Sequence, residues 1–207
     1  GDDDITGGAG KDTISGGDGN DTIDSADGID TLTGGAGNDT FEFMTDGDLT
    51  GGPATVTDNV DGGEGTDLIQ ITTATAITPN LTSIEQVEAT FTGNVALNMS
   101  NVTTLTKATV LTGSNAAASI TGLADGTVTY IGDADFATVD YAAATNATIV
   151  LTLDRSATLN VTDAANVTLT AASSAGDAYN SVALDDVDAV SLTVTGGTAA
   201  TTDINTG

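Results

Sequence analysis

A nine-residue repeat governs the first 42 residues of this chain. Each copy carries a glycine, an aspartate two residues later and a large apolar residue two residues after that, as in Gly10, Asp12 and Ile14. The large apolar positions are Ile5, Ile14, Ile23, Leu32 and Phe41. Glycine-rich segments suit sharp turns, whereas a short Asp-Thr-Ile segment favours a strand and is too short for a helix. The repeat therefore predicts short strands that alternate with tight turns.

One apolar residue in nine gives one inward anchor for each half of a coil. We expect successive copies to alternate between two stacked sheets, so that their turns form two parallel rows. One row would carry Asp3, Asp21 and Asp39, and the other Asp12 and Asp30. The predicted fold class is all-β: a parallel β-roll, followed by a second β-rich part of the chain.

Stacked turns at strand spacing, about 4.8 Å apart, place like charges close enough to repel one another. The whole chain has 30 acidic and 3 basic side chains, and 26 of its acidic residues are aspartates. One apolar residue per nine cannot offset this repulsion together with the entropy cost of ordering the chain. The sequence therefore predicts cations between the turns. Carboxylate and carbonyl oxygens favour calcium over magnesium or zinc.

Residues 7–15, 16–24 and 34–42 match the pattern G-G-x-G-x-D-x-U-x. This pattern resembles the RTX (repeats-in-toxin) calcium-binding nonapeptide of β-roll proteins. The copy at 25–33 keeps Gly28, Asp30 and Leu32 but has Ser25 and Ala26 in place of the glycine pair. The resemblance implies several Ca²⁺ ions between turns two repeats apart, held by aspartates and glycine carbonyls.

A further copy at 62–70 starts 28 residues after Gly34, so residues 43–61 break the register. We expect 1–42 to form the roll, 43–61 an acidic loop that leaves and returns, and 62–70 an isolated nonapeptide that closes the roll. The implied calcium ligands are then Asp3, Gly8, Gly10, Asp12, Gly17, Gly19, Asp21, Gly28, Asp30, Gly35, Gly37, Asp39, Gly63, Gly65 and Asp67. The loop aspartates, which either hold an extra ion or are simply solvated, are Asp46, Asp48, Asp58 and Asp61.

Residues 71–207 are rich in Thr, Val, Ala, Leu and Ile, and many segments alternate apolar with polar residues. This pattern predicts half-buried strands, either in a solenoid that continues the roll or in a meandering sandwich. Two groups of acids are candidate calcium turns or, as the simpler alternative, solvated turn residues. They are Asp133 with Asp135, and Asp185 with Asp188.

The composition excludes several classes of function. The chain has no histidine and no cysteine, which excludes disulfides, cysteine or Ser-His-Asp catalysis and zinc sites that use these residues. A net charge of −27 disfavours nucleic acid and anionic membrane partners, and no stretch is apolar enough for membrane insertion. We expect no enzyme activity.

Residues 81–88, which follow the isolated nonapeptide, and the Thr/Ala/Val/Asn-rich remainder resemble RTX-type bacterial surface-layer (S-layer) proteins. This resemblance implies a calcium-dependent structural module of a secreted protein at the cell surface, with export by type I secretion and self-assembly into a lattice. Neighbouring domains of a longer parent chain are further expected partners. Two alternatives stay open: an RTX adhesin that binds a glycan or cell surface, and the non-catalytic tail of a secreted enzyme.

Overall fold

The computed structural model describes residues 1–44, 57–112, 117–124, 127–132, 136–153, 158–173, 181–185, 189–195 and 204–206. These residues form strands and turns and include no helix, so none of them lies in a helix long and apolar enough to cross a membrane. Several predicted acidic ligands lie outside the described residues, namely Asp46, Asp48, Asp133, Asp135 and Asp188.

The strands of the nonapeptide region and its continuation are short. They are β1 (Asp4–Thr6), β2 (Thr13–Asp18), β3 (Thr22–Asp24), β4 (Thr31–Ala36), β5 (Thr40–Phe43), β6 (Asn59–Glu64), β7 (Leu68–Thr73), β8 (Asn80–Thr82), β9 (Gln86–Phe91), β10 (Val95–Asn98) and β11 (Lys107–Thr112). Those that follow are β12 (Ala117–Leu123), β13 (Val128–Gly132), β14 (Phe136–Leu153), β15 (Thr158–Ser173), β16 (Ser181–Asp185), β17 (Ala189–Thr195) and β18 (Ile204–Thr206).

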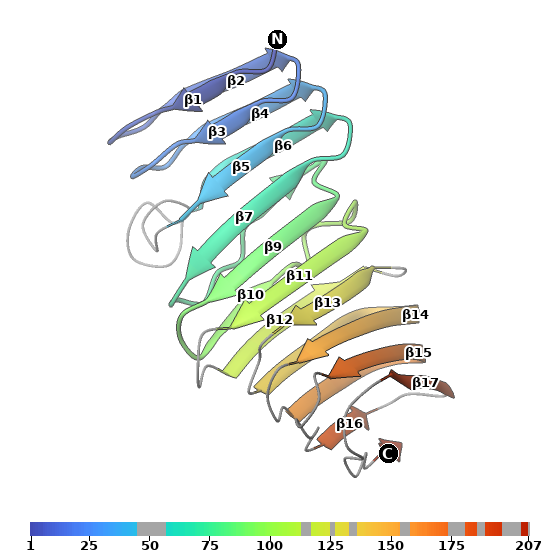
Figure 1. The fold of residues 1–207 in the computed structure, drawn as a ribbon. Coiled ribbons are helices and arrows are strands. Elements are labelled where there is room, and N and C mark those ends of the chain that lie inside the picture. Colours follow the sequence, from blue (N-terminus) through green and yellow to red (C-terminus); the bar gives the residue numbers. More distant parts are fainter. Residues whose placement is uncertain are drawn as a thin grey trace.

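The strands stack as a parallel β-solenoid (Figure 1). One sheet runs in the order β1-β3-β5-β7-β9-β11-β13, and the opposite sheet in the order β2-β4-β6-β8. Every strand pair in the described residues is parallel, including those after residue 71 such as β9 with β11. The all-β prediction with a parallel roll is confirmed, and the second part of the chain continues as a solenoid rather than as a sandwich.

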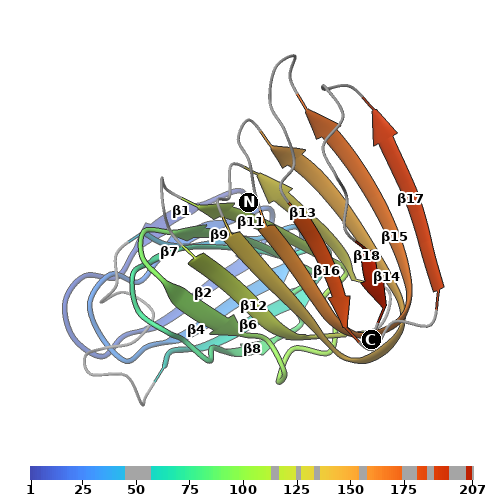
Figure 2. The same ribbon diagram turned by 90° about the horizontal axis from the view of Figure 1, so that it is seen from below.

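Toward the C-terminal end, the larger sheet continues through β10, β12 and β14, whereas the sheet of β2, β4 and β6 ends at β8. The first half of β14 pairs with β12 and its second half pairs with β13, and the pairing of β14 with β15 shifts register between Asp140 and Ala144. Figure 2 shows β14 and β15 as long curved strands that extend from one side of the solenoid to the other. The turn between sheets has therefore become continuous strand in these coils.

The core lies between the two sheets and widens along the stack. β3 buries one residue, Ile23, whereas β5 buries Phe41 and Phe43. β9 buries three, at Val87, Ala89 and Phe91. The predicted anchors Ile23, Leu32 and Phe41 are fully buried, while Ile5 and Ile14 pack against the core and stay partly exposed.

The register explains the break in the repeat. Coils of the roll are offset by 18 residues, as between Asp3 and Asp21, but the coil that contains the predicted loop is offset by 28, as between Asp30 and Asp58. The nonapeptide that begins at Gly62 stacks directly on the one at Gly34, because Gly35 pairs with Gly63. Residues 59–61, expected in the loop, belong to β6.

Candidate metal centre

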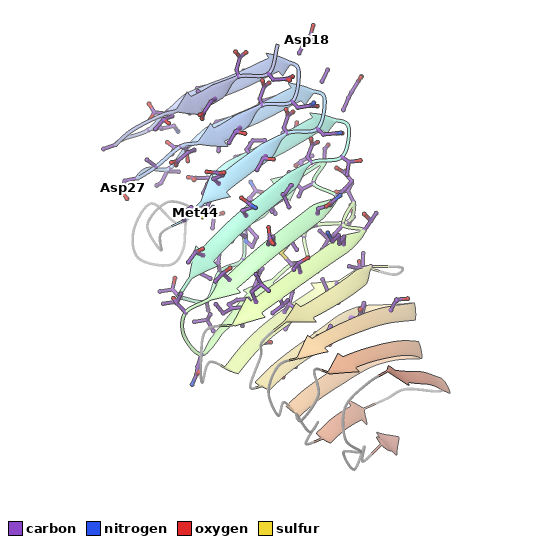
Figure 3. All side chains as sticks on the ribbon, viewed as in Figure 1. Asp18, Asp27 and Met44 are labelled. Atoms are coloured by element: carbon purple, nitrogen blue, oxygen red, sulfur yellow. The ribbon has the colours of Figure 1, made fainter. Side chains whose placement is uncertain are left out.

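The turns form two rows at opposite edges of the solenoid. Figure 3 places Asp18, at the end of β2, at one edge, and Asp27 and Met44 at the other. We call the first edge the long row, whose acidic residues are Asp3, Asp21, Asp39, Asp67 and Glu85. We call the other edge the short row, with Asp12, Asp30 and Asp58.

In the long row, each carboxylate binds the backbone of the preceding coil. Asp21 Oδ1 accepts a hydrogen bond from the N–H of Asp3 at 2.8 Å, and Asp39 Oδ1 accepts one from Asp21 at the same distance. Asp67 Oδ1 accepts a hydrogen bond from the N–H of Asp39, also at 2.8 Å. The sequence placed the first three aspartates in one row, and the structure brings them together with Asp67.

The short row follows the same rule. Asp30 Oδ1 accepts a hydrogen bond from the N–H of Asp12 at 2.8 Å, and Asp58 Oδ1 accepts one from Asp30 at 2.7 Å. Asp58 is fully buried, so it holds the position of a repeat aspartate rather than that of a residue in an acidic loop. A signal for this was present in the sequence: Asp58 precedes the glycine pair at Gly62 by four residues, as Asp30 precedes Gly34.

The second carboxylate oxygen of these aspartates is buried and lacks a hydrogen-bond partner. This holds for the Oδ2 atoms of Asp21, Asp30, Asp39 and Asp67, whose residues are at most 1% exposed. A buried carboxylate oxygen without a partner is costly, because desolvation of the charge is uncompensated. Four such atoms in two regular rows indicate that a positively charged ligand completes each turn.

A carbonyl oxygen from the next coil faces the same space. A β-carbon added at Gly34 would overlap Asp39 Oδ2 and lie 2.6 Å from the carbonyl oxygen of Gly62. At Gly7, an added β-carbon would lie 3.0 Å from Asp12 Oδ2 and 2.8 Å from the carbonyl oxygen of Ser25. At Gly7 and Gly34, the absence of a side chain therefore lets a carboxylate oxygen and a carbonyl oxygen of the next coil lie close together.

The other glycines that the sequence nominated as ligands shape the turns. All but one of them have left-handed backbone, with φ between 104° and 139°: Gly8, Gly10, Gly17, Gly19, Gly35, Gly37, Gly63 and Gly65. Carbonyl oxygens in these turns face the glycine of the next coil, as Gly17 faces Gly35, so a side chain there would collide with backbone.

The degenerate copy at 25–33 turns differently. Ala26, in place of a glycine, has φ of 60°, and its N–H binds the side chain of Asp24 at 3.0 Å. Gly28 has lost the left-handed conformation and sits against the carbonyl oxygen of Gly10. The hydroxyl of Ser25 is buried without a partner. This turn keeps Asp30 in the row, although its backbone path departs from the repeat.

Two further candidates lie elsewhere. Asp61 is part of β6, where it pairs in register with Thr33 and Thr82, so it lies on a strand rather than in a turn row. Asp185 ends β16. Sequence reasoning missed Glu85, whose carboxylate accepts a hydrogen bond from the N–H of Asp67 at 2.9 Å and so extends the long row.

The electrostatics of the long row favour a cation. Burial raises the pKa of Asp67, and the neighbouring charges of Asp39, Glu85 and Asp61 raise it further, against the opposing effect of the Asp39 N–H bond. A bound cation would reverse these effects, since it stabilises the ionised carboxylate.

The donor set fits calcium. In the described residues, no three acidic, histidine or cysteine side chains gather into a group that could hold a metal ion. The groups that would hold each ion are an unpartnered aspartate oxygen, as Asp39 Oδ2, and a backbone carbonyl oxygen of the next coil, as that of Gly62. Such an all-oxygen and irregular shell suits Ca²⁺, whereas Mg²⁺ demands a stricter octahedron and zinc prefers nitrogen and sulfur.

Comparison with protein families agrees with this geometry. A family model described as the RTX calcium-binding nonapeptide repeat (4 copies) matches residues 1–32 and residues 18–48. Neither the curated proteins nor the solved structures give a match, so no relative supports the resemblance to S-layer proteins. RTX repeats bind calcium ions at several sites, and proteins that carry them are typically secreted. The matched segments therefore carry RTX calcium-binding nonapeptide repeats, and residues 1–44 form the first coils of a longer parallel β-solenoid.

Proposed function

We propose that this chain is a calcium-dependent structural module of a secreted bacterial cell-surface protein of the S-layer type. The observation that carries the proposal is the set of buried aspartate oxygens without partners in the two turn rows. These atoms make folding of the roll depend on an ion, because their negative charges stack at strand spacing.

The mechanism is folding coupled to ion binding. At low calcium concentration, as in a cytosol, the aspartates repel and the first coils stay unfolded. At the millimolar calcium found outside cells, sites with Kd of about 10⁻⁴–10⁻³ M fill and the coils close. Export before folding, as in type I secretion, fits this dependence.

Assembly into a lattice is the finer part of the proposal. The net charge of −27 keeps copies of the chain apart in the absence of calcium, since like charges repel. Bound calcium lowers this repulsion, so the same ion that folds the roll permits self-association. We propose no catalytic role, and partners are other copies and neighbouring domains of a longer chain.

The test is a calcium titration of the chain, followed by far-UV circular dichroism and light scattering, with magnesium as the control. A transition from coil to β-structure that only calcium produces, together with growth in particle size, supports the proposal. The same folding without growth contradicts lattice assembly and favours an adhesin or an enzyme tail. A spectrum that ignores both calcium and EDTA contradicts calcium-coupled folding itself.

A further inference from the structure

The turn at residues 83–85 continues the long row beyond the last nonapeptide. The N–H of Gln86 binds the carbonyl oxygen of Asp67 at 2.9 Å, just as the N–H of Leu68 binds that of Asp39 at 2.9 Å. The carboxylate of Glu85 accepts a hydrogen bond from the N–H of Asp67 at 2.9 Å, as the carboxylate of Asp67 accepts one from the N–H of Asp39 at 2.8 Å. Glu85 therefore occupies the place of a repeat aspartate in a segment that lacks the repeat pattern.

This turn is shorter than a nonapeptide turn. Before it, Asn59 and Asn80 are offset by 21 residues, whereas after it Asp67 and Glu85 are offset by 18, so three residues are missing. Ser83 makes the tighter path possible with a left-handed φ of 51°. Glutamate has one more methylene than aspartate, and this length lets its carboxylate reach the preceding coil from the shorter turn.

A carboxylate oxygen of Asp67 and the carbonyl oxygen of Ser83 lie close together at Gly62. A β-carbon added at Gly62 would overlap both Asp67 Oδ2 and the carbonyl oxygen of Ser83. Asp67 is fully buried, and its Oδ2 has no hydrogen-bond partner. One coil earlier, Asp39 Oδ2 and the carbonyl oxygen of Gly62 border the equivalent space at Gly34. The oxygens of a repeat site are thus reproduced by a turn of different sequence.

We propose that Asp67, Ser83 and Glu85 form a further calcium site, which joins the aspartate of the last nonapeptide to a turn outside the pattern and ends the long row. This inference rests on the proposed calcium-dependent function, which it deepens. In the next coil the threonine hydroxyls of Thr104 and Thr106 bond to Ile84 and Glu85, so the row of carboxylates stops at Glu85. An ion at this place ties the last coil of the roll to β9, the strand that follows Glu85.

The test counts calcium ions on the whole chain by equilibrium dialysis with elemental analysis. Glu85→Gln keeps the size of the side chain but removes its charge, and we expect it to bind one ion fewer than the unaltered chain. Glu88→Gln is the matched control, because Glu88 lies on β9, is partly exposed and accepts a hydrogen bond from Gln70 instead of facing the turn. It removes the same charge and should leave the count unchanged.

A second measurement locates the ion. In the unaltered chain, calcium should slow hydrogen exchange of the β9 amides, and Glu85→Gln should lose this effect while β3 and β5 keep it. If Glu85→Gln does not fold, Glu85→Asp retains the charge with a shorter reach, and we expect it to bind the last ion at least tenfold more weakly.

The outcomes separate the two proposals. A chain that binds no calcium overturns both the proposed function and this site. A chain that binds several ions, of which Glu85→Gln or Glu85→Asp keeps the full number at unchanged affinity, overturns this site alone. Loss of an ion in Glu88→Gln equal to that in Glu85→Gln also overturns it, since the effect would then follow net charge rather than the turn.

Discussion

The roll and the solenoid that continues it solve the same problem with different chemistry. In both parts, as far as the structure describes them, side chains in turns of the long row bond to the backbone of the preceding coil. In the roll this side chain is an aspartate that accepts an N–H, as Asp39 does for Asp21. In the later coils it is a threonine that donates to a carbonyl oxygen, as Thr127 does to Leu105 at 3.0 Å. The hydroxyl is neutral, whereas the carboxylate leaves a charge and a buried oxygen to be satisfied.

The hydrophobic core is also smaller in the roll than in the coils that follow it. β3 contributes one buried residue to the interior, but β9 contributes three. Each fully buried aliphatic or aromatic side chain stabilises the fold by about 1.5–3 kcal/mol. The later coils therefore have more apolar support and fewer charges, and the roll has less support and more charges. The comparison teaches that ion dependence belongs to the roll and ends near Glu85.

Chelation should produce the largest difference between the two parts. A site filled at a tenfold excess over its Kd stabilises the folded state by about 1.4 kcal/mol, so several sites together supply a large part of the stability of a domain. We expect EDTA to abolish hydrogen-exchange protection in β1 to β5 and to lower it in β9, while β11 keeps most of its protection. Magnesium added back should not restore the roll. Equal loss of protection in β3 and β11 would show that the two parts fold as one unit and would break the comparison.

A single methyl group should distinguish the turns of the two parts. At Gly34 an added β-carbon meets Asp39 Oδ2 and the carbonyl oxygen of Gly62, whereas at Gly93 the nearest atom is the carbonyl oxygen of Ala74 at 3.4 Å. Neither glycine has a left-handed φ, so the backbone conformation does not confuse the result. In saturating calcium, we expect Gly34→Ala to lower the free energy of unfolding by about 3 kcal/mol or more. Gly93→Ala should change it by no more than about 0.5 kcal/mol. Urea unfolding measures the stability of both variants. Similar unfolding midpoints for the two would contradict the close approach of Asp39 Oδ2 and the Gly62 carbonyl oxygen at Gly34.

Much of the roll could be read from its spacing. Glycine, aspartate and one apolar residue recur at fixed positions, and each of these residue types has a single structural use in so short a repeat. The pairing of Asp3 with Asp21 and of Asp12 with Asp30 follows from a coil of two copies. The nine-residue spacing did not predict the coil with an offset of 28 residues. There the strand pairing involves residues 59–61, and it does not depend on the length of the segment before them.

The missed residues have a physical reason. Glu85 takes the place of a repeat aspartate in a turn that is three residues shorter, and this shortening is visible from strand registers but not from a motif. The choice between solenoid and sandwich after residue 71 was similarly open, since alternating Thr and Val residues suit parallel and antiparallel strands alike. Pairing of β7 with β9 at the same offset as in the roll decides it in favour of stacking.

Alkaline pH should act on the later coils through Tyr141. Burial raises the pKa of Tyr141 to about 12, although the hydrogen bond with Thr129 at 2.9 Å opposes this effect. The folded state therefore holds the phenolic proton more tightly than the unfolded state, and stability falls as the pH rises from about 10 toward 12, by up to roughly 2 kcal/mol. Absorbance at 295 nm should show one of the three tyrosines ionising late, and Tyr141→Phe should remove that phase. A single phase near pH 10 that includes Tyr141 would contradict its burial.

The smallest effect expected is that of a hydroxyl in the turn next to the last carboxylate. Thr104 accepts the N–H of Ile84 at 3.1 Å and donates to its carbonyl oxygen at 2.8 Å, so it does for the turn at 83–85 what aspartates do for earlier turns. Thr104→Val removes both bonds from a solvent-accessible position and should cost about 1 kcal/mol. Its neighbour Thr103→Val is the control, because Thr103 is exposed and lies outside this pair of bonds. Because the hydroxyl carries no charge, the loss in free energy of unfolding caused by Thr104→Val should be the same at every calcium concentration that keeps the roll folded. A loss that grows as calcium is lowered would place Thr104 among the ion-dependent coils, which would then extend beyond Glu85.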